Sequence, residues 1–221
     1  MKNIILVEGK DNFFIQRLIQ GIVVKPMGGL NNLTMELNIL KNSFPKTPYE
    51  KLGIILDQDI VTKSERLIFV NKCLQDVFGI QSSENDKVTP NIQLSDTQIF
   101  STIEIQEIPL QIACYFVNVN GVGELETLLR LIKTQLSPYS DCLQEWQNCL
   151  TEKVSQKEFD KLWVHYYIKH DTATRKERKQ ADQLTFENSL KKNPPIWDFN
   201  SPILDELKGF LALFEIEHIT K

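Results

Sequence analysis

Two aspartates one residue apart, Asp57 and Asp59, are the residues of this sequence best suited to binding a metal ion. They follow a nearly unbroken apolar run at residues 52–56, which predicts a strand buried on both faces of a parallel sheet. Side chains two residues apart on an extended chain point the same way, so the two carboxylates can share one cation. Ligands of parallel sheets bind at the carboxyl ends of the strands, and this pair follows such an end.

Glu8 is a third carboxylate in the same kind of position, because it follows the largely apolar run at residues 3–7. Asp11 is suited to cap the helix that begins after it. Mg²⁺ takes oxygen ligands and keeps several waters, so one or two protein carboxylates and a substrate phosphate complete its shell. Glu8, Asp57 and Asp59 therefore predict a site for Mg²⁺, which Mn²⁺ could also fill. Crowded carboxylates repel one another, so we expect the ion to stabilise the fold.

Apolar runs alternate with helical patterns along the first 136 residues. The predicted strands are residues 3–7, 22–24, 52–56 and 113–117, with edge strands or a hairpin between 91 and 105. The predicted helices are residues 12–19, 31–44, 67–78 and one that begins at residue 124. This alternation predicts an α/β fold, in which a mostly parallel sheet is flanked by helices and joined by right-handed crossovers.

From residue 137 onward the composition shifts toward helix formers and aromatic residues. We expect residues 137–221 to form a helical extension or cap on an α/β domain of residues 1–136. Its last helix should begin after Ser201 and pack on the core. The aromatic stripe of Trp163, Tyr166 and Tyr167 is more typical of a core than of a surface that stacks on bases.

A basic segment interrupts this helical region. It holds Arg175, Lys176, Arg178 and Lys179, with Glu177 among them. Such a segment is commonly an exposed helix face on which opposite charges alternate, but clustered cations also bind the phosphates of nucleic acid. The net charge of −4 and the pI near 5.5 give no global attraction to nucleic acid. A polyanion would therefore bind to a local patch or through a metal ion.

Cysteine spacing and hydropathy bear on where the protein works. The four cysteines show no Cys-x-x-Cys spacing. We also recognise no signal peptide and no apolar stretch long enough to span a bilayer. We therefore expect a reduced, cytoplasmic protein that has no membrane partner.

Two short motifs resemble those of the Toprim fold: Val-Glu-Gly-Lys-Asp at residues 7–11 and Ile-Leu-Asp-Gln-Asp at residues 55–59. Their order and strand context make the chain similar to the small Toprim-like proteins grouped with ribonuclease M5 and the OLD-type nucleases. Residues 123–129 and 198–202 are also similar to that group. The resemblance covers residues 1–135 and implies a Toprim-like, Rossmann-like sheet.

The resemblance implies a role for each acid. Glu8 matches the first-strand glutamate that serves in acid–base chemistry or ligates metal, and Asp57 and Asp59 match the aspartate pair that holds Mg²⁺. Lys10 and Asp11 match the form of the first motif found in ribonuclease M5. In a two-metal phosphodiesterase one ion activates water and the other stabilises the leaving oxygen, while Lys10 would neutralise charge on the phosphate.

A second ion needs further ligands, for which the resemblance offers Asp11 and Glu126, with Glu124 as the alternative to Glu126. As acids in the first turn of a helix, Glu124 and Glu126 also have an ordinary explanation in the helix dipole. Asn12 departs from the pattern, because many relatives carry a second acid at this position. This departure weakens the case for a complete two-metal site.

The ordered acids favour a Mg²⁺-dependent nuclease that hydrolyses phosphodiester bonds of DNA or RNA. Asn12 favours the alternative of a non-catalytic metal-binding and nucleic-acid-binding module that acts with a partner protein or as a homodimer. A haloacid-dehalogenase phosphatase would need its Asp-x-Asp motif on the first strand and a later Gly-Asp-x-x-x-Asp motif, and neither feature is present. Sugar-nucleotide transfer at an Asp-x-Asp metal site has similarly little support.

Overall fold

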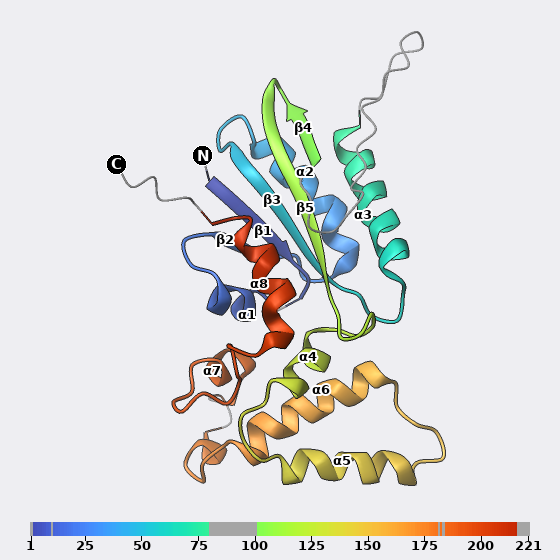
Figure 1. The fold of residues 1–221 in the computed structure, drawn as a ribbon, viewed down its shortest axis with the longest axis vertical. Coiled ribbons are helices and arrows are strands. Elements are labelled where there is room, and N and C mark those ends of the chain that lie inside the picture. The colour runs from blue at the N-terminus through green and yellow to red at the C-terminus, as the bar shows by residue number, and fades with distance from the viewer. Residues whose placement is uncertain (1, 10, 80–100, 181, 183, 216–221) are drawn as a thin grey trace. The chain divides into compact units, whose positions relative to one another are not determined.

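A computed structural model of the protein describes residues 2–9, 11–79, 101–180, 182 and 184–215 (Figure 1). The chain divides into two compact units, Met1–Phe116 with Leu207–Lys221 and Val117–Glu206. The sequence predicts a division at residue 136, whereas the second unit begins at Val117. Residues 125–131 form a helix whose side chains bond to a later helix of the second unit, which accounts for this boundary.

The first unit is built on a sheet of five strands, counted over the described residues, in the order β2-β1-β3-β5-β4. The strands are β1 Lys2–Val7, β2 Val23–Pro26, β3 Tyr49–Asp57, β4 Ser101–Ile105 and β5 Ile108–Val117. β1 pairs in parallel with β2 and β3, β5 runs in the direction of β3, and β4 is the antiparallel edge strand (Figure 1). The predicted α/β fold with a mostly parallel sheet is therefore confirmed.

β1 and β3 are the strands that position the predicted acids. Their register places Leu6 opposite Ile54 and Val7 opposite Ile55, so the two strands end at the same edge of the sheet. Residues 4–7 and 52–57 are buried without interruption, as strands covered on both faces require. The residue that follows β1 and the last residue of β3 are therefore neighbours.

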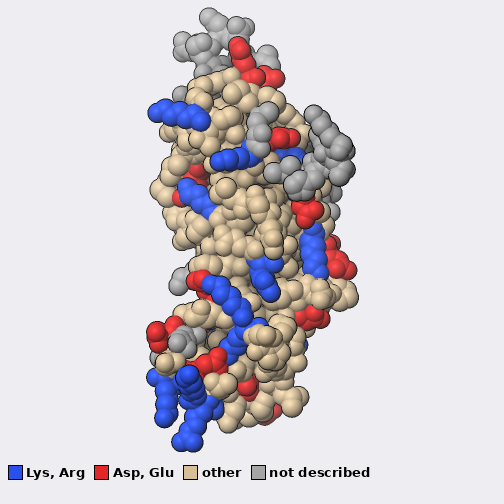
Figure 2. Space-filling view, turned by 90° about the vertical axis from the view of Figure 1, so that its left-hand side faces the viewer, with Lys and Arg blue, Asp and Glu red and all other residues tan. Residues whose placement is uncertain are grey.

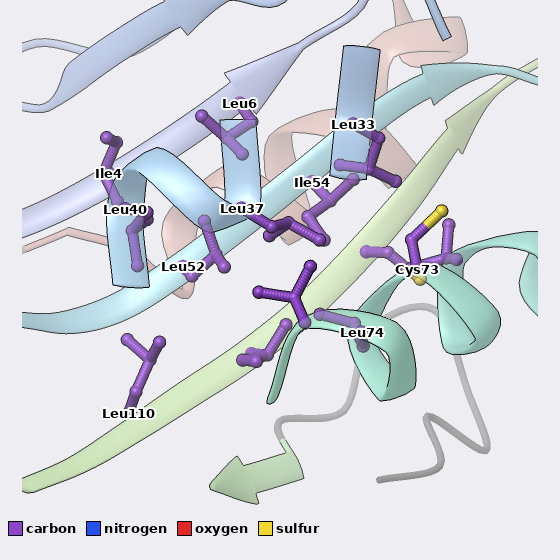
Figure 3. Close-up of a cluster of buried hydrophobic side chains, with 14 of the residues drawn as sticks. Ile4, Leu6, Leu33, Leu37, Leu40, Leu52, Ile54, Cys73, Leu74 and Leu110 are labelled. Atoms are coloured by element: carbon purple, nitrogen blue, oxygen red, sulfur yellow. The ribbon is translucent and has the colours of Figure 1, made fainter. Parts of the chain in front are cut away.

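Helices cover both faces of this sheet (Figure 1). They are α1 Asn12–Leu18, the 3₁₀ turn η1 Leu30–Asn32, α2 Leu33–Ser43, α3 Lys63–Phe78 and α8 Asp205–Ala212. α2 and α3 lie over one face, where leucines from both helices pack against apolar side chains of the strands (Figure 3). On the other face Phe214, which follows α8, lies close to Gly53 and Ile5.

α3 begins soon after the Asp57–Asp59 motif, and its first turn is fixed by a capping box. The Glu65 N–H donates to Thr62 Oγ1 at 3.2 Å, and the Thr62 N–H donates to Glu65 Oε2 at 2.8 Å. Arg66 is the next residue along this turn and is buried. The capping box thus fixes the start of the turn that carries Arg66, and the Arg66 guanidinium donates to the Gln58 carbonyl and to Asp59 just after β3.

The second unit is mainly helical. Its elements are α4 Leu125–Leu131, α5 Pro138–Cys149, α6 Gln156–Tyr166, the π-helix η2 Tyr167–Asp171, the 3₁₀ turns η3 Glu177–Lys179 and η5 Pro202–Leu204, and α7 Phe186–Ser189. Trp163 stacks on Tyr167 with ring centroids 5.1 Å apart, and Tyr167 packs on Trp197 at 5.1 Å. Trp163 and Tyr167 thus belong to the core as predicted, whereas Tyr166 is exposed.

Asp160 joins α4 to α6 in this unit. Its buried carboxylate accepts hydrogen bonds from Thr127 Oγ1 at 2.6 Å and from Gln156 Nε2 at 2.8 Å, and it pairs with Arg130. A buried charge is tolerated when it is paired and hydrogen-bonded in this way. Within the described part of the chain, none of the helices is both long enough and apolar enough to cross a membrane.

Candidate functional site

Glu8 and Asp57 lie side by side at the carboxyl ends of β1 and β3. The Glu8 N–H donates to the Ile55 carbonyl at 3.0 Å, which continues the ladder between the two strands. The Asp57 N–H donates to Glu8 Oε2 at 3.2 Å. Asp57 is 8% exposed and Glu8 is half-buried. Parallel pairing thus brings together two of the acids that the sequence singles out.

Asp59 departs from the extended backbone on which the sequence-based expectation rests. The expectation that Asp57 and Asp59 point the same way holds for an extended chain, but the φ angle of Asp59 is +57°. Its Oδ2 accepts a hydrogen bond from Arg66 at 2.8 Å, and the same guanidinium nitrogen donates to the Gln58 carbonyl at 3.1 Å. Asp59 is therefore held by α3, in an ion pair with an arginine that the sequence reasoning did not single out.

The remaining acid of the first motif is close to Glu8 along the chain. Asp11 occupies the N-cap position of α1, but its side chain makes no capping hydrogen bond. A Cβ placed on Gly9 would lie 3.9 Å from Asp11 Oδ1, so the Asp11 carboxyl turns back over the loop that follows β1. Asn12 is buried at the start of the helix. Lys10 lies outside the described residues.

The donor set at this edge of the sheet suits a hard cation. Across the described residues, no three His, Cys, Asp or Glu side chains converge closely enough to form a protein-only metal centre. Mg²⁺ does not need such a centre, because it keeps several waters and uses one or two carboxylates together with a phosphate. Carboxylate oxygens such as those of Glu8 and Asp57 are ligands that suit Mg²⁺ or Mn²⁺, whereas two of them would not form a closed tetrahedral zinc site.

Glu124 and Glu126 belong to the second unit. Glu124 is 1% exposed, and its Oε2 lies 3.1 Å from Lys157 Nζ and 3.4 Å from Lys161 Nζ. Burial and the neighbouring Glu124 charge raise the pKa of Glu126, and the two lysines offset part of this rise. This pair of acids is thus already accompanied by two cations of the protein.

The basic segment faces solvent, as an alternating charged face would. Its four cations, Arg175, Lys176, Arg178 and Lys179, are all exposed. Glu177 accepts a hydrogen bond from the Thr174 N–H at 2.7 Å and pairs with Lys192 at 3.2 Å, and the Thr174 N–H leads the contacts that lower its pKa. The acid of the segment is thus engaged with the protein. Figure 2 shows lysine and arginine side chains gathered at the lower end of the face it draws.

A pocket of about 630 Å³ lies at the opposite edge of the sheet, by the turn before β5. Lys41, Asp76 and Gln106 are among its lining residues. None of the acids predicted to bind metal lines this pocket. The carboxyl edge of the sheet, where Glu8 and Asp57 meet, therefore remains the candidate site on chemical grounds.

The family model of a protein of unknown function, DUF3226, matches residues 2–215. The chain belongs to the DUF3226 family. The DUF3226 match spans both compact units, so the acids at the sheet edge and the helical unit with the basic segment are parts of the same family architecture. No curated protein and no solved structure matches the chain.

The DUF3226 description assigns no activity, so the chemistry of this member has to be inferred from its residues. Two carboxylates at adjacent strand ends can hold a divalent cation. A third acid, Asp59, is within the same motif but is engaged by Arg66. Glu8 and Asp57 are therefore the acids at this edge that could contribute to such a site, and Asp59 Oδ2 is already engaged by Arg66.

Proposed function

We propose that this DUF3226 protein is a Toprim-like, metal-dependent nuclease that hydrolyses phosphodiester bonds of DNA or RNA. The observation that carries the proposal is the placement of Glu8 against the Asp57 backbone at the carboxyl ends of two parallel strands. Mg²⁺, or Mn²⁺ in its place, would be held by Glu8 and Asp57. When bound, the ion would neutralise charge on the phosphate and make bound water more acidic.

The protein's own groups supply the rest of the chemistry in this proposal. Glu8 would orient the attacking water and accept its proton. Lys10 would contact the phosphate and offset its developing charge. Asp11, which follows β1 in the first unit, is the acid proposed for a second ion. The exposed cations of the basic segment, residues 175–179, would contact the phosphates of the nucleic-acid backbone.

Cleavage of labelled single-stranded and double-stranded DNA and RNA tests this proposal directly. We expect cutting with Mg²⁺ or Mn²⁺ that stops when EDTA is added. Asp57→Asn and Glu8→Gln should each lower the rate by about 100-fold or more, because they remove an ion ligand and the proton acceptor. The matched control is Asp76→Asn, which removes an exposed carboxylate on α3 away from the site. Cleavage that persists in both site variants would refute the proposal.

A second candidate function is favoured by the Arg66–Asp59 ion pair and by the amide at Asn12. Both features reduce the number of carboxylates available to metal. We propose as the alternative a non-catalytic module that binds metal and nucleic acid and acts with a partner protein or as a homodimer. It predicts oligonucleotide binding that depends on metal and on Asp57, measured by calorimetry, in a protein that cuts none of the four substrates. Metal-dependent cutting would exclude it.

A further inference from the structure

Four rings form a continuous row on the second unit, which we call the ring row: Tyr139 of α5, His170 of η2, and Tyr166 and His165 of α6. The Tyr139 and His170 rings are 6.1 Å apart, the His170 and Tyr166 rings 5.0 Å, and the Tyr166 and His165 rings 6.2 Å. Tyr139 is 58% exposed and Tyr166 is 36% exposed. The ring row therefore presents aromatic surface to solvent.

The helical segments that carry the ring row are packed on a buried and hydrogen-bonded core. On the other side of α6 and η2, Trp163 and Tyr167 are buried, and the Tyr167 hydroxyl donates to the Ile196 carbonyl at 3.1 Å. The same hydroxyl accepts a hydrogen bond from the Gln135 N–H at 3.0 Å. Tyr166 and His170 are thus fixed by a helix whose opposite face is anchored. Rings that are already in place lose little conformational entropy when a ligand stacks on them.

The π-helix joins Tyr139 to the rings of α6. Thr172 N–H donates to the Tyr167 carbonyl at 3.0 Å, which closes a π-turn, an uncommon element that is frequent at functional sites. The turn presents Asp171 to the start of α5. There its carboxylate accepts hydrogen bonds from the Tyr139 N–H at 2.9 Å and the Ser140 N–H at 3.0 Å. Asp171 thereby holds α5 so that Tyr139 continues the ring row.

Lys169 of η2 supplies a cation beside the ring row, since its charge acts on His165. Burial, and then the neighbouring positive charges of Lys169 and His170, lower the pKa of His165. Asp171, the acid of η2, is directed at the backbone of α5. The basic segment at residues 175–179 follows η2 along the chain and is exposed. Rings combined with cations complement a ligand that carries both flat bases and phosphates.

We propose that the ring row binds single-stranded nucleic acid by stacking on unpaired bases, with Lys169 and the basic segment contacting the phosphates. This inference rests on the proposed function, which names nucleic acid as the ligand. It specifies further that the ligand is a strand with unpaired bases. The bases of a duplex are stacked on one another, so their faces are not available to side chains. Single strands offer these faces, and stacking on them is tolerant of sequence.

The test measures binding of a fluorescein-labelled oligothymidylate of about 12 nucleotides by fluorescence anisotropy, with the full chain in EDTA. Tyr166→Ala and Tyr139→Ala should each raise the Kd by about 5- to 150-fold, as expected for the loss of one stacked base. Tyr166→Phe keeps the ring and should bind like the wild type. Trp146→Ala, which removes an exposed aromatic residue of α5 outside the ring row, should also leave the Kd unchanged. A duplex of the same length should bind more weakly.

Any of the following results would overturn the inference. The first is wild-type affinity in both alanine variants, and a Tyr166→Phe defect equal to that of Tyr166→Ala would count in the same way. The second is an absence of oligonucleotide binding by the wild-type chain. The third is a dimer in sedimentation that depends on Tyr166, again without oligonucleotide binding, which would assign the ring row to a second copy of the chain.

The two proposals fail in different experiments. Ring-dependent binding in EDTA without any cleavage in Mg²⁺ would support the ring row and refute the nuclease. Cleavage that requires Asp57, combined with binding that does not respond to Tyr139 or Tyr166, would support the nuclease and refute the ring row.

Discussion

Asp59 and Arg66 form an ion pair, and we predict that removing its acid destabilises the protein more than removing its arginine. Arg66 is 6% exposed and donates to Asp59 and to the Gln58 carbonyl. These bonds stabilise the folded chain by about 2–4 kcal/mol, but Nε of Arg66 meets no acceptor among the described residues, which costs about 1–3 kcal/mol. Arg66→Met removes both contributions and should lower the unfolding free energy by about 1 kcal/mol. Asp59→Asn leaves the guanidinium buried without its counter-ion, so it should cost about 2–3 kcal/mol.

Urea unfolding followed by circular dichroism measures this difference. Asn tolerates the left-handed backbone of residue 59, so Asp59→Asn changes the charge and not the conformation. Lys72→Met is the matched control, because it removes an exposed cation from the same helix and should change stability by less than about 0.5 kcal/mol. The variant that combines Asp59→Asn with Arg66→Met should lose less unfolding free energy than the two single variants lose together. An Arg66→Met variant that is less stable than Asp59→Asn would refute the reasoning.

Two further predictions concern packing and pH. At Gly53 an added Cβ would lie 2.9 Å from Phe214 and 3.0 Å from Ile5, so Gly53→Ala should lower the unfolding free energy in urea by about 1–3 kcal/mol. Gly209→Ala, at an exposed position of α8 with no atom within 4 Å of the new Cβ, should instead raise it by about 0.5–1 kcal/mol; equal effects would contradict this explanation. The pKa of Glu126 is raised above 4.5 by burial and by Glu124, so ionisation of Glu126 costs folding free energy as the pH rises through that pKa. Glu126→Gln should therefore melt higher than the wild type at neutral pH, with the difference closing below pH 4.5, and a wild type that melts higher at neutral pH would contradict the assigned direction.

The sheet is the part of the fold that the sequence predicts best, for a physical reason. β1 and β3 are covered on both faces, so each consists largely of consecutive apolar residues, and such runs can be recognised in the sequence. β3 nevertheless begins at Tyr49, before its apolar run, because Tyr49 and Lys51 pair with β1 through the backbone. Backbone pairing does not depend on polarity, so hydrophobic pattern cannot locate such strand ends.

The candidate site was predictable only as far as regular geometry extends. The proximity of Glu8 and Asp57 can be predicted from the sequence, because neighbouring parallel strands end at the same edge of a sheet. The Asp59–Arg66 pair does not, because a left-handed φ and a contact to the next helix leave no periodic signal. A local signal for Arg66 exists in the capping box of Thr62 and Glu65, which fixes where α3 begins.

The same limit applies to the aromatic stripe of the second unit. Trp163 near the end of α6 and Tyr167 at the start of η2 are one helical turn apart and lie on the same buried face, as their spacing predicts. Tyr166 lies at the margin of that face, where spacing cannot separate a buried ring from an exposed one. Its neighbour His170 belongs to a π-turn, which departs from the 3.6-residue repeat of an α-helix.

Both units neutralise acids with cations of the protein itself. Arg66 accompanies Asp59 in the first unit, and Lys157 and Lys161 accompany Glu124 in the second. The expectation that metal stabilises the fold by relieving carboxylate repulsion is therefore weakened, because part of that repulsion is already offset. A small effect of Mg²⁺ on stability would then be compatible with either candidate function. Cleavage that depends on Asp57 distinguishes the two functions, because it reports on the reacting phosphate and not on the charge balance of the fold.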